Sequence, residues 1–525
     1  MNTAATSASL VATPAEKLHL SALAASRPKR RVARQTVVAF RVDVSNQVDF
    51  IHGTPVDAVP ADHVAWKVKK AMELFDFGPI IASASPLGRR GLHPAWVLGP
   101  LLLGSLDGRH HATQIAVQLQ TNAAYRLVSG GHTMDGSVLR AFRRKNLLFF
   151  NDCLDRVIAL AAERGYLDLD QTALDSVRLE ADASTESFCT LERSTKMVKQ
   201  LSAADLTGKT AEQIERHQAR LGKHEAAVTH CKDMDLTNFS RTDPLAALMK
   251  FPHGGARAGH RLTTVVAGTA IRFCIAFFLS SKPTDHNVLP GALVSLRARL
   301  RRVGIPDATF VKVAVDAGFC SESDLAVAYA NDLNIDVTLS QQSFTGGGAV
   351  NAQGLFGKEH FKIEGNNATC PAGKPMSGPF RDGGATISWH GLGCGSCPLR
   401  AQCTTGKYRK LRHNPVTAEM RASLTERMTA ADRQALYAKR GPIVESMYSV
   451  LEDAMGFRRV SSRHRATVQA EIVLKVLAYN LTRLWAADAA RRFWILDMRE
   501  WPIELVEAIT DFLLDLQATN WPKPT

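Results

Sequence analysis

Between Val177 and Leu339 the sequence alternates between strand-like and helix-like patterns, and this alternation restricts the fold more than any other feature. Apolar, β-branched and aromatic runs predict five strands, at 177–182, 263–267, 271–279, 309–315 and 335–339. Helical leucine spacing at 289–300 predicts a helix before the fourth strand, and a Ser321–Asp324 capping box predicts another after it. The order βββαβαβ predicts an α/β core with a mixed sheet flanked by helices.

The segments outside this alternation divide the chain further. Residues 60–170 show helical apolar spacing and predict an all-α N-terminal domain, and a charged helical stretch at 203–235 is inserted into the first part of the core, 171–340. The Gly- and Cys-rich residues 341–435 predict an irregular insertion before the last core helices, 436–490, and a helical tail, 491–525. Residues 1–59, which turn basic at 27–34, predict a disordered lead-in arm.

Composition limits the class of protein. A chain of 525 residues with 45% hydrophobic content can bury more than one core. Its net charge of +14 favours a polyanionic partner, without choosing between DNA and RNA. The longest apolar stretch, Ala95 to Gly104, is too short to span a bilayer, and the N-terminus lacks the order of a secretory signal. We therefore expect a cytoplasmic protein, associated with the nucleoid if its partner is DNA.

The N-terminal domain contains a basic helix pattern. Residues 113–119 and 134–145 predict two helices around a Gly130–Gly131 break, and the second carries Arg140, Arg143 and Arg144. This arrangement is similar to a helix-turn-helix reader and predicts DNA contact by the three arginines. An ordinary helical bundle with a solvated basic face fits the same pattern equally well.

Three carboxylates stand where a nuclease core would need metal ligands. Asp182 ends the first predicted strand, Asp316 follows the fourth, and Glu445 lies on a helix predicted to start after Gly441–Pro442. An RNase H-like core places its three acids at these positions, where they hold two Mg²⁺ (or Mn²⁺) ions about 3.5 to 4 Å apart. Taken singly, each acid has a simpler interpretation, as a turn residue, a helix cap or a helix N-terminal acid.

Several segments, in the correct order, resemble the DDE transposases of bacterial insertion sequences. They are TDPLAALMK (242–250), VDAGF (315–319), CGSCPLRAQCTTGK (394–407), YAKRGPIVESMYSVLEDAMGFRR (437–459) and LAYNLTRL (477–484). The resemblance runs from about Gly91 to Leu484, to the group with a helical N-terminal domain and a Cys-rich insertion. It implies an RNase H-like core that binds terminal inverted repeats and catalyses metal-dependent DNA cleavage and strand transfer, as a homodimer or larger assembly on double-stranded DNA.

The resemblance also implies roles for individual residues. Asp182, Asp316 and Glu445 would bind the catalytic metals, and Arg440 and Tyr437 would contact DNA phosphate. The chain departs from the family where Asp-Gly-Thr is usual at the first acid, because Asp182-Ala183-Ser184 stands there. It also has Glu452 where the family has Lys. A catalytically inactive or repurposed DNA-binding protein is therefore the alternative, and a nuclease that never joins strands is a second one.

Two further patterns concern metal and DNA. Cys370, Cys394, Cys397 and Cys403 are separated by 23, 2 and 5 residues, which permits a Cys₄ zinc site, although reduced packed thiols fit as well. The run RRVSSRHR at 458–465, which begins with Arg458 and Arg459, follows the predicted catalytic helix. We expect this run to follow the DNA backbone beside the active site.

Overall fold

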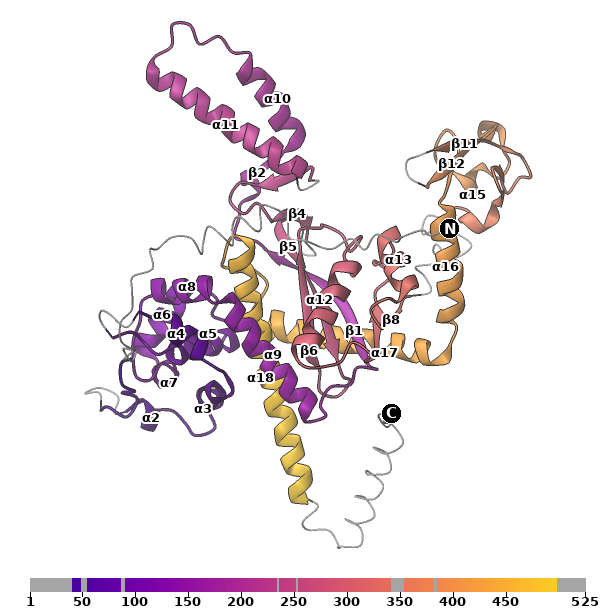
Figure 1. Cartoon of the computed structure of the whole chain (residues 1–525). Helices are drawn as coiled ribbons and strands as arrows, with labels where there is room; N and C mark the ends of the chain where they lie inside the picture. Colours follow the sequence, from indigo (N-terminus) through magenta and orange to yellow (C-terminus); the bar gives the residue numbers. More distant parts are fainter. Residues whose placement is uncertain are drawn as a thin grey trace, which may run out of the picture.

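The computed structural model describes residues 40–48, 54–85, 90–233, 236–251, 254–340, 354–381 and 385–497. The expectations for residues 1–39 and 498–525 lie outside the described residues. The N-terminal part is helical (Figure 1). Its elements are α2 (Pro55–Ala58), α3 (Val64–Ala71), η1 (Met72–Leu74), α4 (Gly78–Ser83), α5 (Pro94–Leu106), α6 (Ala112–Thr121), α7 (Ala123–Val128), α8 (Gly136–Lys145) and α9 (Leu147–Glu163).

Helix α5 is the centre of this helical part because its sequence is apolar on every side, and nearly all of its residues are buried. Gly99 allows α7 to approach closely, since a Cβ at this position would lie 2.5 Å from the carbonyl oxygen of Val128. Among the described residues, no helix is both long and apolar enough to cross a membrane.

A mixed six-stranded sheet forms the centre of the molecule. Its strands and the two helices between them are β1 (Thr172–Glu180), β4 (Ala247–Lys250), β5 (Ala256–Ala267), β6 (Phe273–Ser280), α12 (Leu289–Arg302), β7 (Val311–Val315), α13 (Glu322–Ala330) and β8 (Ile335–Thr338). The strands β5, β1, β7 and β8 are neighbours in that order, and both β4 and β6 pair with β5. β1 runs antiparallel to β5 and parallel to β7, and β7 runs parallel to β8.

Most of the predicted core elements are confirmed, including the β5–β6 hairpin and the Ser321–Asp324 capping box. The prediction for the first strand is wrong in its bounds. β1 begins at Thr172 and ends at Glu180, whereas the sequence pattern placed it at 177–182. The extra residues are TALDS, in which Thr172, Ala173 and Leu174 are buried and pair with β7. Long-range pairing therefore extends the strand over a stretch whose local pattern was weak.

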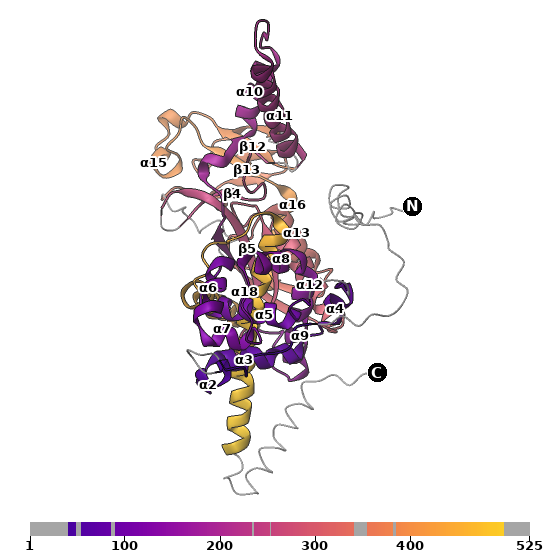
Figure 2. The same ribbon diagram turned by 90° about the vertical axis from the view of Figure 1, so that its left-hand side faces the viewer.

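Two segments project from the sheet, as Figures 1 and 2 show. The first contains η2 (Thr185–Ser187), β2 (Phe188–Thr190), α10 (Leu191–Ser202), α11 (Ala211–Asp233) and β3 (Asn238–Ser240). The second contains η3 (Lys358–His360), β9 (Lys362–Glu364), β10 (Asn367–Thr369), β11 (Met376–Arg381), β12 (Ile387–Gly391), η4 (Cys394–Ser396), α15 (Arg400–Cys403) and β13 (Lys410–His413). The first projection is larger than the expected helix at 203–235, because α10 packs along α11.

The chain returns to the sheet through α16 (Pro415–Met428), α17 (Ala431–Ser449), the π-helical turn η5 (Val450–Ala454) and α18 (Arg465–Asp497). α17 packs on β1, β5 and β7, and α12 packs on β5 and β6. The prediction that this helix starts after Gly441–Pro442 is wrong, because α17 begins at Ala431 and contains Pro442 in its interior. A Gly-Pro pair usually ends a helix, but here packing against the sheet maintains it.

Helix α18 joins the sheet to the N-terminal helices. The amide side chain of Asn480 accepts a hydrogen bond from the backbone N–H of Cys274 and donates one to its carbonyl, both at 2.9 Å. These two bonds satisfy the backbone groups of Cys274 on the free edge of β6. Other residues of α18 pack against α5 and α9, so the same helix contacts the sheet and the helical part of the chain.

Candidate active site

The ends of two parallel strands bring two carboxylates together. Thr172 to Leu174 of β1 pair with Val313 to Val315 of β7, so Asp175 and Asp316 are the next residues on neighbouring strands. In a parallel pair, residues in register lie side by side. Asp175 was not predicted as a site residue. The structure places it beside Asp316, in the position that the sequence pattern assigned to Asp182.

Arg440 of α17 bridges the two acids. Its Nη1 lies 2.8 Å from Oδ2 of Asp175, and its Nη2 lies 3.3 Å from Oδ1 of Asp316. The Arg440 side chain is 15% exposed, and those of Asp175 and Asp316 are 25% and 43% exposed. One guanidinium therefore binds both carboxylates and offsets one of their two negative charges at a half-buried position, where the attraction is stronger than at the surface.

The electrostatics of the pair follow from its burial. Burial is the largest cause that raises the pKa of Asp175 above its ordinary value, and the charge of Asp316 adds to it, although the Ser176 backbone N–H and Arg440 act in the opposite direction. The pKa of Arg440 is raised, because the two acids outweigh the opposing effect of its burial. A pair of acids in this environment favours any cation that both can share.

Tyr448 fixes the backbone of β1 at this site. Its hydroxyl donates to the carbonyl oxygen of Asp175 at 2.6 Å and accepts from the Thr264 hydroxyl at 2.9 Å. Burial raises the pKa of Tyr448 well above its ordinary value, so the phenol stays neutral. α17 thus contacts Asp175 twice. Arg440 binds the Asp175 carboxylate, and Tyr448 binds the Asp175 backbone carbonyl.

Glu445 lies on α17 between these two contacts. It is exposed, and its carboxylate folds along the helix toward Gly441, where a Cβ would lie 3.2 Å from the carboxylate oxygen. Residues three apart lie on one helix face, so Glu445 is on the side of α17 that also carries Tyr448. Tyr437, half-buried two turns before Glu445, lies near enough to Arg440 to influence its pKa.

Asp182 does not join this group. It follows the end of β1, seven residues beyond Asp175, which corresponds to about 20 Å of extended chain. Its carboxylate accepts from Nε of Arg463 at 2.9 Å and lies 3.4 Å from Nη2 of Arg459. The assignment of Asp182 as a metal ligand stays a prediction, and the structure places Asp175, rather than Asp182, beside Asp316 because β1 starts earlier than expected.

The predicted DNA-contacting arginines lie in different environments. Arg140 and Arg144 of α8 are exposed. The Arg143 side chain is only 7% exposed, donates to the His110 carbonyl at 3.2 Å and lies 3.8 Å from Glu471 of α18. Arg143 therefore faces the interior and is not placed for direct DNA contact. Arg458 is exposed and pairs with Asp453 at 2.6 Å.

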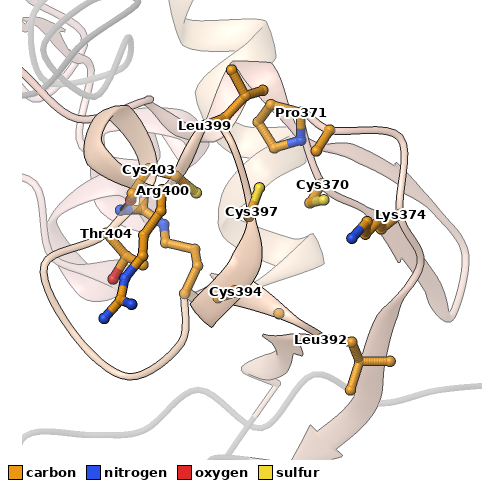
Figure 3. A pocket seen from close by; sticks show the side chains of 13 residues that line it. Cys370, Pro371, Lys374, Leu392, Cys394, Cys397, Leu399, Arg400, Cys403 and Thr404 are labelled. Carbon is orange, nitrogen blue, oxygen red and sulfur yellow. Dashed lines mark hydrogen bonds between the residues drawn. The ribbon is translucent and has the colours of Figure 1, made fainter.

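The four cysteines of the second projection line one small cavity (Figure 3). Cys370 follows β10, Cys394 begins η4, Cys397 follows η4, and Cys403 ends α15. Burial raises the pKa of the Cys403 thiol, and the other three cysteines act in the same direction while Arg409 opposes them. In the part of the chain that the structure describes, no three His, Cys, Asp or Glu side chains form a ready metal-binding group.

The family comparison agrees with the location of these residues. The model of a family described as transposase DDE domain matches residues 369–485, which include all four of these cysteines as well as Arg440, Glu445 and Tyr448. Residues 369–485 are thus similar to a transposase DDE domain. The resemblance to insertion-sequence DDE transposases is thereby confirmed. Among curated proteins and among solved structures, none is significantly similar to the chain.

The transposase domain match begins after Asp175 and Asp316, so the assignment of these two acids depends on the structure. A sequence signal for Asp175 exists. Thr172 to Leu174 are apolar or β-branched, and Asp175 is followed by the small residue Ser176. In the Asp-Gly-Thr pattern of the family, the acid is likewise followed by a small residue, glycine. No comparable signal indicated Tyr448, whose contact with Asp175 spans 273 residues of sequence.

Proposed function

We propose that this transposase binds the terminal inverted repeats of its own element and catalyses metal-dependent DNA cleavage and strand transfer with Asp175, Asp316 and Glu445. The observation that carries the proposal is the bridge from Arg440 to both aspartates, at 2.8 and 3.3 Å, because two carboxylates that share one cation can share another. The strand order supports an RNase H-like core, because β1, β5 and β6 form an antiparallel set and are followed by β7 and β8, which run parallel to β1, while the short strand β4 is an addition that pairs with β5.

The donor chemistry fits a divalent metal, and the three carboxylates would have to converge on it, because among the described residues they do not form a ready metal-binding group. Carboxylate oxygens are the ligands that Mg²⁺ and Mn²⁺ prefer, and Asp175, Asp316 and Glu445 are presented by two adjacent strands and the helix packed on them. Bound metal would supply charge neutralisation at the phosphate and lower the pKa of an attacking water or 3′ hydroxyl.

The remaining groups of the site have separate tasks. Tyr448 holds the backbone of Asp175 in place through its hydroxyl, which positions the carboxylate. Arg440 would exchange its bonds to the carboxylates for a bond to DNA phosphate when metal binds, and Tyr437 beside it would extend the same surface. Joining two element ends requires two such sites, so we infer a homodimer or larger assembly on DNA.

We also infer that Cys370, Cys394, Cys397 and Cys403 bind a structural Zn²⁺ ion. Four thiols around one cavity match the donors of Cys₄ sites, and thiolates need a cation because burial and mutual repulsion otherwise keep Cys403 protonated. Arg400 and Arg409 line the same cavity and would balance the net negative charge of a Zn–Cys₄ group.

Cleavage and strand transfer with Mg²⁺, on DNA that carries the gene's own flanking sequence, test the proposed function. The intact protein should release 3′ ends and join them to a second DNA, and Asp316→Asn and Glu445→Gln should bind the DNA without cutting it. Cutting without joining would support a nuclease. Binding without any cutting by the intact protein would support the inactive, DNA-binding alternative.

A further inference from the structure

A polar cleft opens where β1 ends, at a distance from the proposed catalytic acids. Its volume is about 630 Å³, and its charged lining residues are Glu180, Asp182, Arg257, Arg459 and Arg463. The cleft contains none of the three acids proposed as catalytic, Asp175, Asp316 and Glu445. It lies along the same strand as Asp175, beyond the last residue of β1.

The backbone around the cleft is fixed by pairing at both edges of β1. Glu180 pairs with Gly259 of β5 on one side. On the other side its N–H donates to the Arg458 carbonyl, and its carbonyl accepts from the Val460 N–H, both at 2.9 Å. The segment that follows η5 therefore extends the sheet beside β1. This pairing presents Arg459 to the cleft from a defined position.

Three arginines and two carboxylates face each other in the cleft. Arg257 pairs with Glu180, and Asp182 holds Arg463 at 2.9 Å and Arg459 at 3.4 Å. The arginine side chains remain 48%, 51% and 56% exposed for Arg257, Arg463 and Arg459. Each guanidinium has five N–H donors, of which the carboxylates use only a part. The free donors of all three arginines are therefore available to an anion in the cleft.

We propose that this cleft binds backbone phosphates of duplex DNA, and that Asp182 is an internal competitor for the two arginines that bind them. The inference rests on the proposed function, because it places the cleft on the path of the DNA that reaches Asp175. Five residues of strand, about 17 Å, separate Asp175 from Glu180 at the cleft, which corresponds to roughly five nucleotides at 3.4 Å per nucleotide. The cleft would thus hold DNA that flanks the cleaved bond.

The charges explain the role of Asp182. Its carboxylate occupies the place that a phosphate oxygen would take between Arg459 and Arg463, because both are oxygen acceptors for the same guanidinium donors. Without DNA, Asp182 keeps the two side chains in the cleft and offsets their charge. When DNA binds, a phosphate replaces part of the bonds between Asp182 and the two arginines. The Asp182 carboxylate stays in the cleft and lowers the affinity for DNA.

Equilibrium binding of a fluorescein-labelled 30-base-pair duplex, measured by anisotropy without divalent metal and at several salt concentrations, tests the inference. The test variant is Arg459→Gln with Arg463→Gln. The control is Arg156→Gln with Arg301→Gln, which removes the same charge at two exposed arginines that also pair with carboxylates, Glu163 and Asp307. Thermal melting of each variant checks that its fold is intact.

Loss of one or two phosphate contacts should lower affinity at 0.1 M salt by about eightfold to 60-fold and reduce the salt slope by about 0.9 to 1.8. The control should change affinity by less than about threefold, as expected for bulk charge alone. Asp182→Asn should bind the duplex more tightly than the intact protein. Equal losses in both double variants, or no loss in either, would overturn the inference.

The outcomes separate this inference from the proposed function. If Asp182→Asn binds DNA normally but loses all cleavage, Asp182 is a metal ligand and the competitor role is wrong. If the test variant binds as tightly as the intact protein while the intact protein cleaves, the cleft fails and the function stands. If the intact protein does not cleave but the variants differ as expected, the cleft stands and the catalytic proposal fails.

Discussion

Lys475 offers a direct test of the junction between the N-terminal helices and the sheet. It lies on α18, is 2% exposed, and its Nζ has no hydrogen-bond partner among the described residues. The ammonium lies 5.7 Å from the centre of the Phe457 ring. The charged and titratable groups around this position are Glu471, Arg143 and His110. Burial lowers the pKa of Lys475 to about 7, although Glu471 partly opposes this effect.

The direction in which stability changes with pH follows from proton binding. Between pH 7 and the ordinary pKa of 10.5, the unfolded chain holds a proton that the folded chain does not. Stability therefore rises with pH in this window, and the cost of burying Lys475 is fully present below pH 7. A lowering of about 3.5 pKa units corresponds to about 5 kcal/mol at pH 7, and the cost decreases by about 1.4 kcal/mol for each pH unit above it.

Lys475→Met keeps the length of the side chain and removes its charge. We expect it to raise the free energy of unfolding by up to about 5 kcal/mol at pH 7, and this advantage should shrink by about 1.4 kcal/mol per pH unit toward pH 10. Urea denaturation followed by tryptophan fluorescence at pH 7, 8, 9 and 10 measures both quantities. Lys475→Arg is the control, because arginine cannot lose its proton and should gain no stability from high pH.

A difference between Lys475→Met and the intact protein that stays constant from pH 7 to pH 10 would refute this reasoning. It would mean that Lys475 keeps its charge in the folded chain. A lower stability of Lys475→Met at pH 7 would be stronger evidence against it, because the ammonium would then have a favourable partner that outweighs its burial.

Two other predictions concern single side chains. Arg143→Ala should lower the free energy of unfolding by about 3 kcal/mol, because it leaves the buried Glu471 without its arginine. Arg140→Ala is the control and should change the free energy of unfolding by less than about 0.5 kcal/mol. Thermal melting compares the two variants. An Arg140→Ala variant as unstable as Arg143→Ala would contradict the burial argument. Cys397→Ser should lower the zinc content of the purified protein from one ion per chain and make the segment of residues 354–413 sensitive to protease. A chelator added to the intact protein should have the same two effects. Elemental analysis that finds no zinc in the intact protein would rule out the Cys₄ site.

The sequence was a good guide where local pattern decides the structure. The β5–β6 hairpin follows from two apolar runs around Gly268, and the capping box from Ser321 and Asp324, because neighbours in sequence set both. The carboxylate at the end of β7, Asp316, was also placed correctly, since a continuous apolar strand leads into it.

Local pattern did not indicate that Asp175 lies beside Asp316, because this position depends on register. The register of β1 is set by pairing with β7, about 140 residues later in the chain, and local pattern does not report it. The basic face of α8 raised a similar difficulty. Arg143 has the same local context as Arg140 and Arg144, but Glu471 and the rest of α18, more than 300 residues away, cover only Arg143. Helix amphipathicity cannot show which charged residue a distant element will bury.

The central claim is that Asp175, and not Asp182, is the first acid of the catalytic site. Cleavage of the flanking DNA with Mg²⁺ by Asp175→Asn and Asp182→Asn, at equal protein concentration and with matched DNA binding, tests it most directly. The structure predicts that Asp175→Asn loses cleavage by about 1,000-fold or more, as expected for loss of charge stabilisation at the phosphate, while Asp182→Asn cleaves at a rate close to that of the intact protein. Full cleavage by Asp175→Asn together with none by Asp182→Asn would contradict the account.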